Sequence, residues 1–518
     1  TTCANVANLV LTRNIRRDRE FAVRWAMGAD RARLRRVLLA ETGLLAAAGA
    51  VLGLVLAWSG LELLVGFAAR FTARATEITM DPGVLLFTVG VAAAAALAFA
   101  FAPGLKSQEL AGAMLTRSGS RTTGGSRRLQ RGLIVAQVAA SVVVLAAAGL
   151  LGRTLLTLNA VDPGLDVEDT LTLEAPVIGE GQSIAQMVTL QDEMRRRIAS
   201  LPGIEEVGVG LTVPLRPNLF KLEIRAEGRP PEPGQPVPLA EYRSATPGYF
   251  DAAGMRVVSG RGFEDTDDAG SARVAIVNQA LAERLFGDDD PLGRRVTWTG
   301  EVLSAIGMKE DWRTIVGVVS NTRDDGPDMP PPPVLFQPLA QNDIAYFPGA
   351  FVIRGEAAPM LGARVQQIIN EMSPESPVLR MATLEQIRQE TIAAERLNTF
   401  LVGVLGALAL VIAAVGIAGV LAFSVSARTN EIGIRMSLGA DSGRVQRMVL
   451  GEGGVLLAIG LVLGMALAAA GAQLIRSLLY GISGIDPLTF GAACALFATV
   501  ALIATYVPAR RALAVDPM

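Results

Sequence analysis

Residues 18–53 read DREFAVRWAMGADRARLRRVLLAETGLLAAAGAVLG, and residues 429–464 read TNEIGIRMSLGADSGRVQRMVLGEGGVLLAIGLVLG. The two stretches align without a gap, and the match resumes where Asp81-Pro82 corresponds to Asp486-Pro487 and Pro103 to Pro508. Self-similarity of this kind indicates that one structural module occurs twice in the chain. Both copies carry their basic residues on the same side of the apolar stretch, so we expect them to have the same orientation.

Apolar segments of roughly 20 residues, the length that crosses a bilayer as a helix, recur outside the middle of the chain. They cover 42–66, 82–103, 132–152, 398–422, 453–475 and 487–508, and residues 1–12 resemble the end of another. Residues 153–395 contain none, and their Pro, Gly and charge content is typical of a folded soluble domain. The sequence therefore predicts a multi-span α-helical membrane protein with an α+β extracytoplasmic domain.

Charge is segregated along the chain. Residues 153–395 hold 22 Lys and Arg against 36 Asp and Glu, whereas the remainder holds 25 against 13. Basic residues crowd the loops at 13–36, 106–131 and 428–447. By the positive-inside rule these loops face the cytoplasm. Strict alternation across the spans then places the acidic domain outside, in the periplasm if the cell has one.

The extracytoplasmic domain alternates between β-rich runs and amphipathic segments. We expect an α+β domain in two lobes, whose last helix continues directly into the span near Asn398. The predicted strands are 170–177, 204–213, 220–227, 239–245, 273–278, 314–319, 333–338, 350–354 and 377–382, and the predicted helices are 184–200, 278–286, 359–372 and 383–396.

In the repeated motif Glu-x-x-x-Arg the acid precedes the base by four residues, so the two side chains can pair on one helix face. A glycine that can end this helix follows, and then an aspartate that can begin the next. One interpretation is a short interfacial helix, a sharp turn and a long span. The alternative is a basic loop that only sets topology.

Two further pairs of residues recur in the copies. Gly49 and Gly53 correspond to Gly460 and Gly464, and glycines at this spacing let membrane helices approach closely, so we expect helix packing. Asp81-Pro82 and Asp486-Pro487 are typical of an N-cap followed by proline at the first helical position. We therefore expect them to begin helices and to take no part in chemistry.

Several catalytic chemistries are excluded by composition. The chain has no histidine, and its two cysteines, Cys3 and Cys494, fall in apolar segments. None of its three lysines, Lys106, Lys221 and Lys309, lies in the Gly-Lys-Ser/Thr motif of a phosphate-binding loop. We expect no catalytic residue, no cofactor, no metal site and no nucleic-acid partner, and any ATP hydrolysis has to come from another protein.

Separate motifs carry a family resemblance. The stretch RLQRGLIVAQVAASVVVLAAAGLLGRTLLTLNAVDPGLD at 128–166, TPGYFDAAGMRVVSGRGF at 246–263 and ARTNEIGIRMSLGA at 427–440 resemble FtsX-type and MacB-type ABC transporter permeases, more narrowly the fused two-unit form. The resemblance divides the chain into 1–105, the end of a first FtsX-like module; 106–131, a cytoplasmic linker; 132–152, the first span of the second unit; 153–395, a periplasmic core domain; and 396–518, the second module. On this division the natural N-terminus is expected upstream of Thr1.

The resemblance also implies a function. It implies a non-catalytic permease subunit in the bacterial inner membrane that relays the motion of a cytoplasmic ABC ATPase to the periplasmic domain for export, which is called mechanotransmission. The implied partners are that ATPase, a periplasmic adaptor or substrate protein, membrane lipid, and a second unit in a pseudo-dimer or homodimer. The implied coupling helices carry Glu20, Arg24, Gly28, Ala29, Glu431, Arg435, Gly439 and Ala440.

Two other functions stay open from sequence. An FtsX-like signalling or scaffold protein that activates periplasmic partners would have the same architecture. A secondary transporter is disfavoured because the spans lack carboxylates near the bilayer midplane, where proton- and ion-coupled carriers place them. The substrate is not encoded in any motif of the chain.

Overall fold

The computed structural model describes residues 31–69, 79–101, 123–176, 183–218, 220–229, 234, 236–305, 310–342, 349–427 and 442–513. These residues form two compact units. One comprises Leu158–Ala393, and the other comprises the helices on either side of it in sequence.

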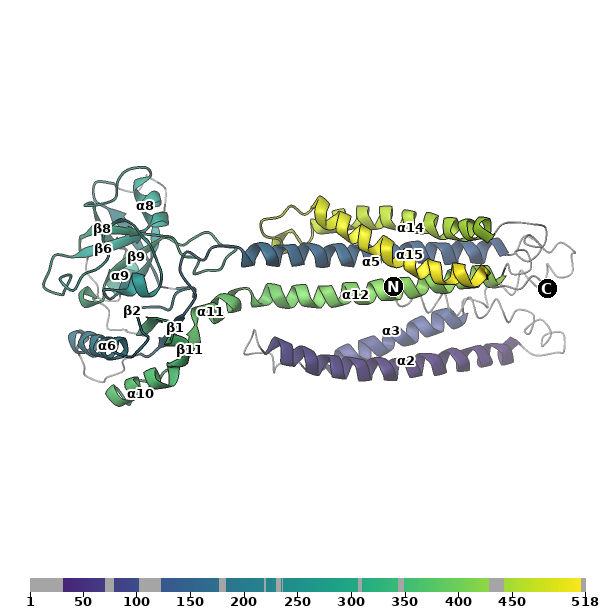
Figure 1. Ribbon diagram of the computed structural model, residues 1–518, viewed down its shortest axis with the longest axis horizontal. Coiled ribbons are helices and arrows are strands. Elements are labelled where there is room, and N and C mark those ends of the chain that lie inside the picture. Colours follow the sequence, from purple (N-terminus) through teal and green to yellow (C-terminus); the bar gives the residue numbers. More distant parts are fainter. Residues whose placement is uncertain are drawn as a thin grey trace, which may run out of the picture. The chain divides into compact units, whose positions relative to one another are not determined.

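The membrane unit consists of long apolar helices (Figure 1). They are α2 (Arg31–Ala68), α3 (Pro82–Phe101), α5 (Thr123–Asn159), α12 (Ala393–Ala427), α14 (Ser442–Ala472) and α15 (Pro487–Leu513). Among the described residues, five of these are long and apolar enough to cross a membrane, and α3 contributes a shorter apolar stretch, Pro82–Val91. The predicted multi-span helical fold is confirmed. The predicted span 453–475 is too long, because α14 ends at Ala472 and a 3-10 turn, η5 (Arg476–Leu478), follows.

Helix α5 and the three helices of the second module, α12, α14 and α15, share a core. Ile134, Val138 and Val142 form one face of α5, where they recur every four residues and therefore lie on one side of the helix. This face packs with Ala413 and Ile417 of α12, Phe497 and Ala501 of α15, and Leu457 and Leu461 of α14. A second cluster towards the other end of α5 joins Ala146 and Leu150 to Ala468, Ala472 and Phe490.

Both Asp-Pro pairs begin helices as predicted. The backbone N–H of Gly83 donates to Asp81 Oδ1 at 2.9 Å, and the backbone N–H of Thr489 donates to Asp486 Oδ2 at 2.8 Å. Pro82 and Pro487 are the first residues of α3 and α15. Each aspartate therefore satisfies a backbone donor that the helix itself leaves free.

The unit Leu158–Ala393, here called the outer domain, is built on one mixed sheet, in which we distinguish two parts. The sheet lobe is the antiparallel run β11–β1–β10–β2, and the barrel lobe is the closed ring β4–β3–β7–β8–β6–β9, which β4 completes by pairing in parallel with β9. The strands are β1 (Thr170–Glu174), β2 (Glu206–Gly210), β3 (Lys221–Ala226), β4 (Leu239–Ala245), β5 (Val257–Gly260), β6 (Val274–Asn278), β7 (Arg295–Thr299), β8 (Arg313–Val319), β9 (Val334–Pro338), β10 (Ala350–Arg354) and β11 (Arg380–Thr383).

Helices cover the two lobes differently (Figure 1). Met194 and Ile198 of α6 and Val365 and Ile369 of α10 pack on the sheet lobe, whereas Leu281 of α8 packs on the barrel lobe. The helical elements of this unit are α6 (Ile184–Ala199), α7 (Tyr249–Ala252), α8 (Gln279–Phe286), α9 (Glu301–Ala305), η3 (Leu339–Gln341), η4 (Ala358–Met360), α10 (Gly362–Met372) and α11 (Leu384–Thr391).

The structure differs from the sequence prediction in several elements. The short helices α7 and α9 were not predicted. Strands β5 and β7 were not predicted either: all four residues of β5 are exposed, so it lacks the apolar alternation of a strand, and β7 is short and follows a Pro-Leu-Gly turn. The predicted helix 383–396 is wrong as one element. It is interrupted at Ile392, whose φ of −111° and ψ of 16° leave the helical region, so that α11 ends and α12 begins at Ala393.

Candidate functional site

The predicted coupling residues lie outside the described residues. Glu20, Arg24, Gly28 and Ala29 precede α2, and the corresponding residues Glu431, Arg435, Gly439 and Ala440 lie in the segment between α12 and α14. The structure does describe the contacts of α5 within the membrane unit and a junction between the first and last segments of the outer domain, and these form the candidate site.

The four packing glycines differ between the two copies. A Cβ atom on Gly460 would come within 2.6 Å of Val138 Cβ, and one on Gly464 within 2.8 Å of Val142 Cβ, so at both positions α14 approaches α5 too closely for a larger residue. Gly49 and Gly53 have no described atom within 4 Å of such a Cβ, and both are exposed. Close helix packing at these positions is therefore a property of the second copy among the described residues.

At the domain end of this bundle, α5 is also fixed to α15 by charge. Arg153 of α5 forms an ion pair with Asp486, the N-cap of α15. The side chain of Asp486 is 13 % exposed, so the pair is partly shielded from solvent. The pair joins α5 to α15 within the membrane unit, shortly before Thr157, where this unit ends in α5.

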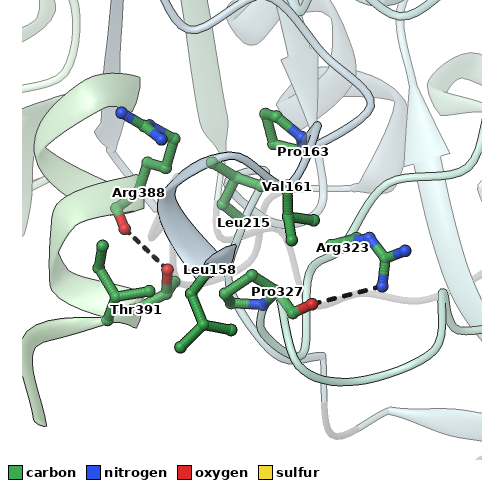
Figure 2. Close-up of a pocket in the computed structure, with 9 residues that line it drawn as sticks. Leu158, Val161, Pro163, Leu215, Arg323, Pro327, Arg388 and Thr391 are labelled. Atoms are coloured by element: carbon green, nitrogen blue, oxygen red, sulfur yellow. Dashed lines mark hydrogen bonds between the residues drawn. The ribbon is translucent and has the colours of Figure 1, made fainter. Parts of the chain in front are cut away.

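The two chain segments that enter and leave the domain meet at a junction (Figure 2). Arg388 of α11 donates from Nη1 to the carbonyl of Asn159, the last residue of α5, at 3.4 Å, and makes a bidentate pair with Glu385 at 2.8 and 3.0 Å. The hydrogen bond with Glu385 raises the pKa of Arg388. A cation at the end of α5 also interacts favourably with its helix dipole. The junction residues are Leu158, Val161, Pro163, Leu215, Arg323, Pro327, Arg388, Thr391 and Ile392.

The space between these residues is a cavity of about 20 Å³. A cavity of this size holds about one water molecule. The junction residues are therefore closely packed and leave no room for a drug-sized molecule.

The segment after α5 is fastened to a loop of the barrel lobe. The backbone N–H of Arg323 donates to the carbonyl of Pro163 at 3.2 Å, and Ser320 Oγ donates to the carbonyl of Gly164, also at 3.2 Å. Gly164 has a φ of +82°, and a Cβ atom there would lie 1.8 Å from the carbonyl oxygen of Asn321. Only glycine fits this conformation and this contact.

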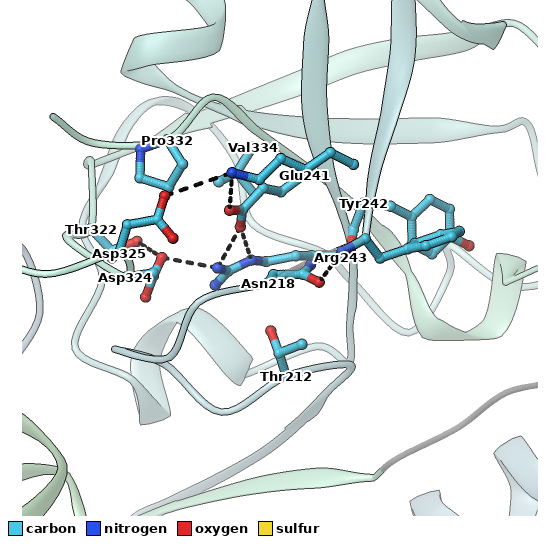
Figure 3. Close-up of polar contacts among 12 residues, drawn as sticks. Thr212, Asn218, Glu241, Tyr242, Arg243, Thr322, Asp324, Asp325, Pro332 and Val334 are labelled. Atoms are coloured by element: carbon cyan, nitrogen blue, oxygen red, sulfur yellow. Dashed lines mark hydrogen bonds and ion pairs between the residues drawn. The ribbon is translucent and has the colours of Figure 1, made fainter. Parts of the chain in front are cut away.

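Asp324, in the same loop, belongs to a buried ionic cluster (Figure 3). Arg243 of β4 donates to Glu241 at 2.7 Å and lies 3.0 Å from Asp324 Oδ2, while Asp324 Oδ1 accepts the backbone N–H of Leu215 at 2.7 Å. Glu241 and Asp324 are fully buried and Arg243 is 3 % exposed. Lys221, which is 40 % exposed, lies 3.6 Å from Glu241 Oε1 and connects the cluster to the surface.

Burial and the neighbouring charges shift the pKa values of Glu241 and Arg243 in opposite directions. Burial raises the pKa of Glu241 against the opposing effect of Arg243. Burial alone would lower the pKa of Arg243, but the carboxylates of Asp324 and Glu241 outweigh it and raise that pKa. Arg243 therefore stays charged and holds two carboxylates that would otherwise be costly to bury.

Sequence reasoning missed this cluster, although part of the signal was present. Glu241 and Arg243 are two residues apart in a strand, so they lie on the same face, and the strand is otherwise mostly apolar. Charges of opposite sign at that spacing in a central strand indicate a buried pair. Nothing in the Pro-rich stretch around Asp324 distinguishes it from a surface loop residue.

Comparison with known proteins agrees with this architecture. The FtsX-like permease C-terminal family model matches residues 1–108 and 403–517, and the MacB-like periplasmic core domain model matches residues 132–373. The uncharacterized ABC transporter permease YknZ of Bacillus subtilis is 23 % identical over 344 residues, which is 65 % of this chain and 80 % of YknZ. The macrolide export ATP-binding/permease protein MacB of Marinobacter nauticus is 28 % identical over 273 residues, which is 51 % of this chain and 40 % of MacB.

Two solved structures are also similar. The periplasmic region of MacB from Actinobacillus actinomycetemcomitans matches with a TM-score of 0.30 and 13 % identity over 44 % of this chain and 93 % of that one. The extracellular domain of YknZ matches with a TM-score of 0.26 and 16 % identity over 39 % of this chain and 93 % of that one. The chain spans less than half the length of the MacB relative from Marinobacter. The two family models together cover most of the sequence, and the chain belongs to the FtsX-type and MacB-type ABC transporter permeases.

Proposed function

We propose that this chain is the non-catalytic permease subunit of a bacterial inner-membrane ABC exporter, which relays the motion of a cytoplasmic ATPase to a periplasmic domain. The observation that carries the proposal is the junction of Arg388 with the end of α5. Two membrane helices, α5 and α12, are continuous in sequence with the domain, and the junction and the Gly164 contact hold the first and last segments of the domain in place. In this proposal, motion of the two helices reaches the domain through these segments.

The energy source in this proposal is a separate protein. The sequence has no phosphate-binding loop, and the junction cavity of about 20 Å³ is too small for a nucleotide or a drug-sized solute. Movement of a substrate that is already outside the membrane needs no pore through the helices. It needs only a partner ATPase and a periplasmic adaptor or substrate protein that contacts the outer domain.

Gly439→Val tests how the ATPase engages the permease. If the segments at 19–27 and 430–438 are coupling helices, a β-branched residue at the turn after the second helix costs about 1 kcal/mol or more where the backbone needs positive φ. We expect the variant to insert normally but to recover several-fold less ATPase on copurification. Arg435→Glu, which inverts the charge pair with Glu431, should act in the same way.

The matched control is Gly451→Val in α14, where no described atom lies within 4 Å of the new Cβ. Membrane levels of all variants are equalised before ATPase turnover is compared, and wild-type permease alone should show no turnover. Equal recovery and equal stimulation by wild type and Gly439→Val would mean that these loops only set topology.

The topology itself is tested by cysteine labelling. Asp288, at an exposed position of the outer domain, and Ser118, in the predicted cytoplasmic linker, are each replaced by cysteine after Cys3 and Cys494 are changed to serine. We expect a membrane-impermeant maleimide to label Asp288→Cys in intact spheroplasts and Ser118→Cys only after lysis. The reverse pattern would overturn the assignment of the acidic domain to the periplasm.

A further inference from the structure

Helices α5 and α12 are joined inside the bundle by three hydrogen bonds from side chains to backbone carbonyls. Gln137 Nε2 donates to Ile412 O at 2.9 Å, Ser141 Oγ to Ala409 O at 3.2 Å, and Thr399 Oγ1 to Leu151 O at 3.3 Å. We call these three contacts the α5–α12 ladder. Along α5 the ladder extends from Gln137 to Leu151, about 21 Å at the rise of an α-helix, so it covers most of the bilayer core.

The donors on α5 face the protein interior. Gln137 is 4 % exposed and Ser141 is 1 % exposed. In a bilayer, a polar group without a partner is costly, and neighbouring helices usually supply the partner. Each donor therefore favours the arrangement in which α12 presents a carbonyl opposite it.

Gly406 lies where α12 packs against α5. A Cβ atom on Gly406 would lie 3.6 Å from Ala148 Cβ and 3.7 Å from Leu145 Cδ1, so an alanine side chain would already fill this space in ordinary van der Waals contact. Sliding by one helical turn, about 5.4 Å, in the direction that brings Leu410 to this place would introduce a larger side chain.

The same antiparallel order continues in the outer domain, where Arg388 donates to Asn159 O. The segment before α12 and the end of α5 are therefore also joined beyond the bundle. Contacts at both levels oppose sliding of one helix along the other.

We propose that α5 and α12 act as a single lever that keeps one register throughout the transport cycle, with Gln137, Ser141 and Thr399 as positioning residues. This inference rests on the proposed function. The alternative is a piston, in which α5 moves along α12 and pulls on one side of the domain only. The two models differ in whether the contact between Ala148 and Gly406 survives turnover.

A disulfide between these positions distinguishes the models. The Cβ separation of 3.6 Å at Ala148 and Gly406 lies within the range that a disulfide requires. Ala148→Cys/Gly406→Cys is made in the full chain with Cys3 and Cys494 replaced by serine, and is compared with the shifted pair Ala148→Cys/Leu410→Cys. Cross-linking is measured in membranes that contain the host's ATPases, with ATP depleted, with ATP, and with ATP and vanadate.

We expect the 148/406 pair to cross-link to the same extent in all three conditions and the 148/410 pair to stay below one tenth of that yield. The rate of ATP hydrolysis by the copurified ATPase should differ by less than about twofold between the disulfide-linked and the reduced permease. The lever model requires no change of register, so the disulfide should not slow it. Formation of the 148/410 cross-link under ATP, or a tenfold loss of turnover that dithiothreitol restores, would establish the piston.

Removal of the ladder is the second arm. Gln137→Leu/Ser141→Ala should increase the 148/410 cross-link at least threefold and lower stimulated turnover, whereas Ser141→Thr, which retains the hydroxyl, should behave as wild type. Unchanged cross-linking in the double variant would show that these side chains do not hold the register. If no ATPase copurifies with wild type, the proposed function fails, whereas the cross-linking pattern still decides between one register and two.

Discussion

Replacing Arg243 by methionine is expected to lower the free energy of unfolding of the outer domain by about 3–5 kcal/mol, because it leaves buried carboxylates without their cation. Glu241 and Asp324 are both fully buried, and Lys221 reaches only the outer side of Glu241. Urea unfolding of residues 158–393, expressed as a separate domain, measures the effect.

The control for this variant is Arg197→Met. Arg197 pairs with Glu371 at 3.0 Å, the same separation as Arg243 and Asp324, but both side chains are at least 40 % exposed. Exposed pairs contribute about 0–1 kcal/mol. Comparable losses in the two variants would show that burial does not determine the role of Arg243.

The effect should also depend on pH. Burial already raises the pKa of Glu241 in the folded domain. A raised folded pKa means that protonation favours folding, so this contribution is present below the ordinary pKa of the carboxyl and is lost as pH rises through the raised value. Without Arg243 the folded pKa rises further. The gap in stability between Arg243→Met and wild type should therefore narrow as pH falls from 7 towards 4.

Gly164→Ala is expected to destabilise the same domain by about 2–5 kcal/mol, as the sum of a left-handed backbone in a non-glycine residue and a steric clash. The new Cβ would lie 1.8 Å from the carbonyl oxygen of Asn321, so the segment after α5 has to leave its place on the barrel lobe. Thermal unfolding of the domain provides the measurement.

Gly228→Ala separates the two causes. Gly228 has a similar φ of +72° but no described atom within 4 Å of a Cβ, so its replacement incurs only the backbone cost of about 1–2 kcal/mol. In the full chain, Gly164→Ala should also reduce stimulated ATPase turnover, whereas Gly228→Ala should not. Equal stability losses at the two positions would mean that the contact with Asn321 contributes nothing.

Much of the fold could be predicted from sequence because the deciding patterns are local. The length of an apolar segment predicts a span, and a cap motif predicts the helix starts at the two Asp-Pro pairs. Short apolar runs predict strands such as β4 and β6. Exposed strand β5 carries no apolar alternation, and the interruption at Ile392 lies within a sequence of good helix formers. Both depend on tertiary contacts, which local propensity does not contain.

The candidate site was harder to predict for the same reason. Gly460 and Gly464 were predicted to pack, and the structure places them against α5, because glycine spacing is itself the signal. The identical spacing in Gly49 and Gly53 has no described partner, so the motif alone does not identify what it contacts. The junction of Arg388 with Asn159 and the pairing of Arg243 with Asp324 join residues more than 80 positions apart. No spacing rule in one sequence connects such residues.

The order in which strands pair has a consequence for biosynthesis. Among the described residues, strand β1, the first to follow α5, pairs with β10 and β11, the last strands before α12, and β4 completes the barrel lobe when β9 is present. Folding that depends on contacts so distant in sequence is slow, because each closes a long loop of chain before it gains stability. Strands β3 and β4, and β7 and β8, are close in sequence and can pair early. The sheet lobe, in contrast, cannot form until nearly the whole domain has crossed the membrane. Until then β1 lacks its strand partners and is exposed to proteases and chaperones, and its protection should begin only once the segment leading into α12 has been translocated.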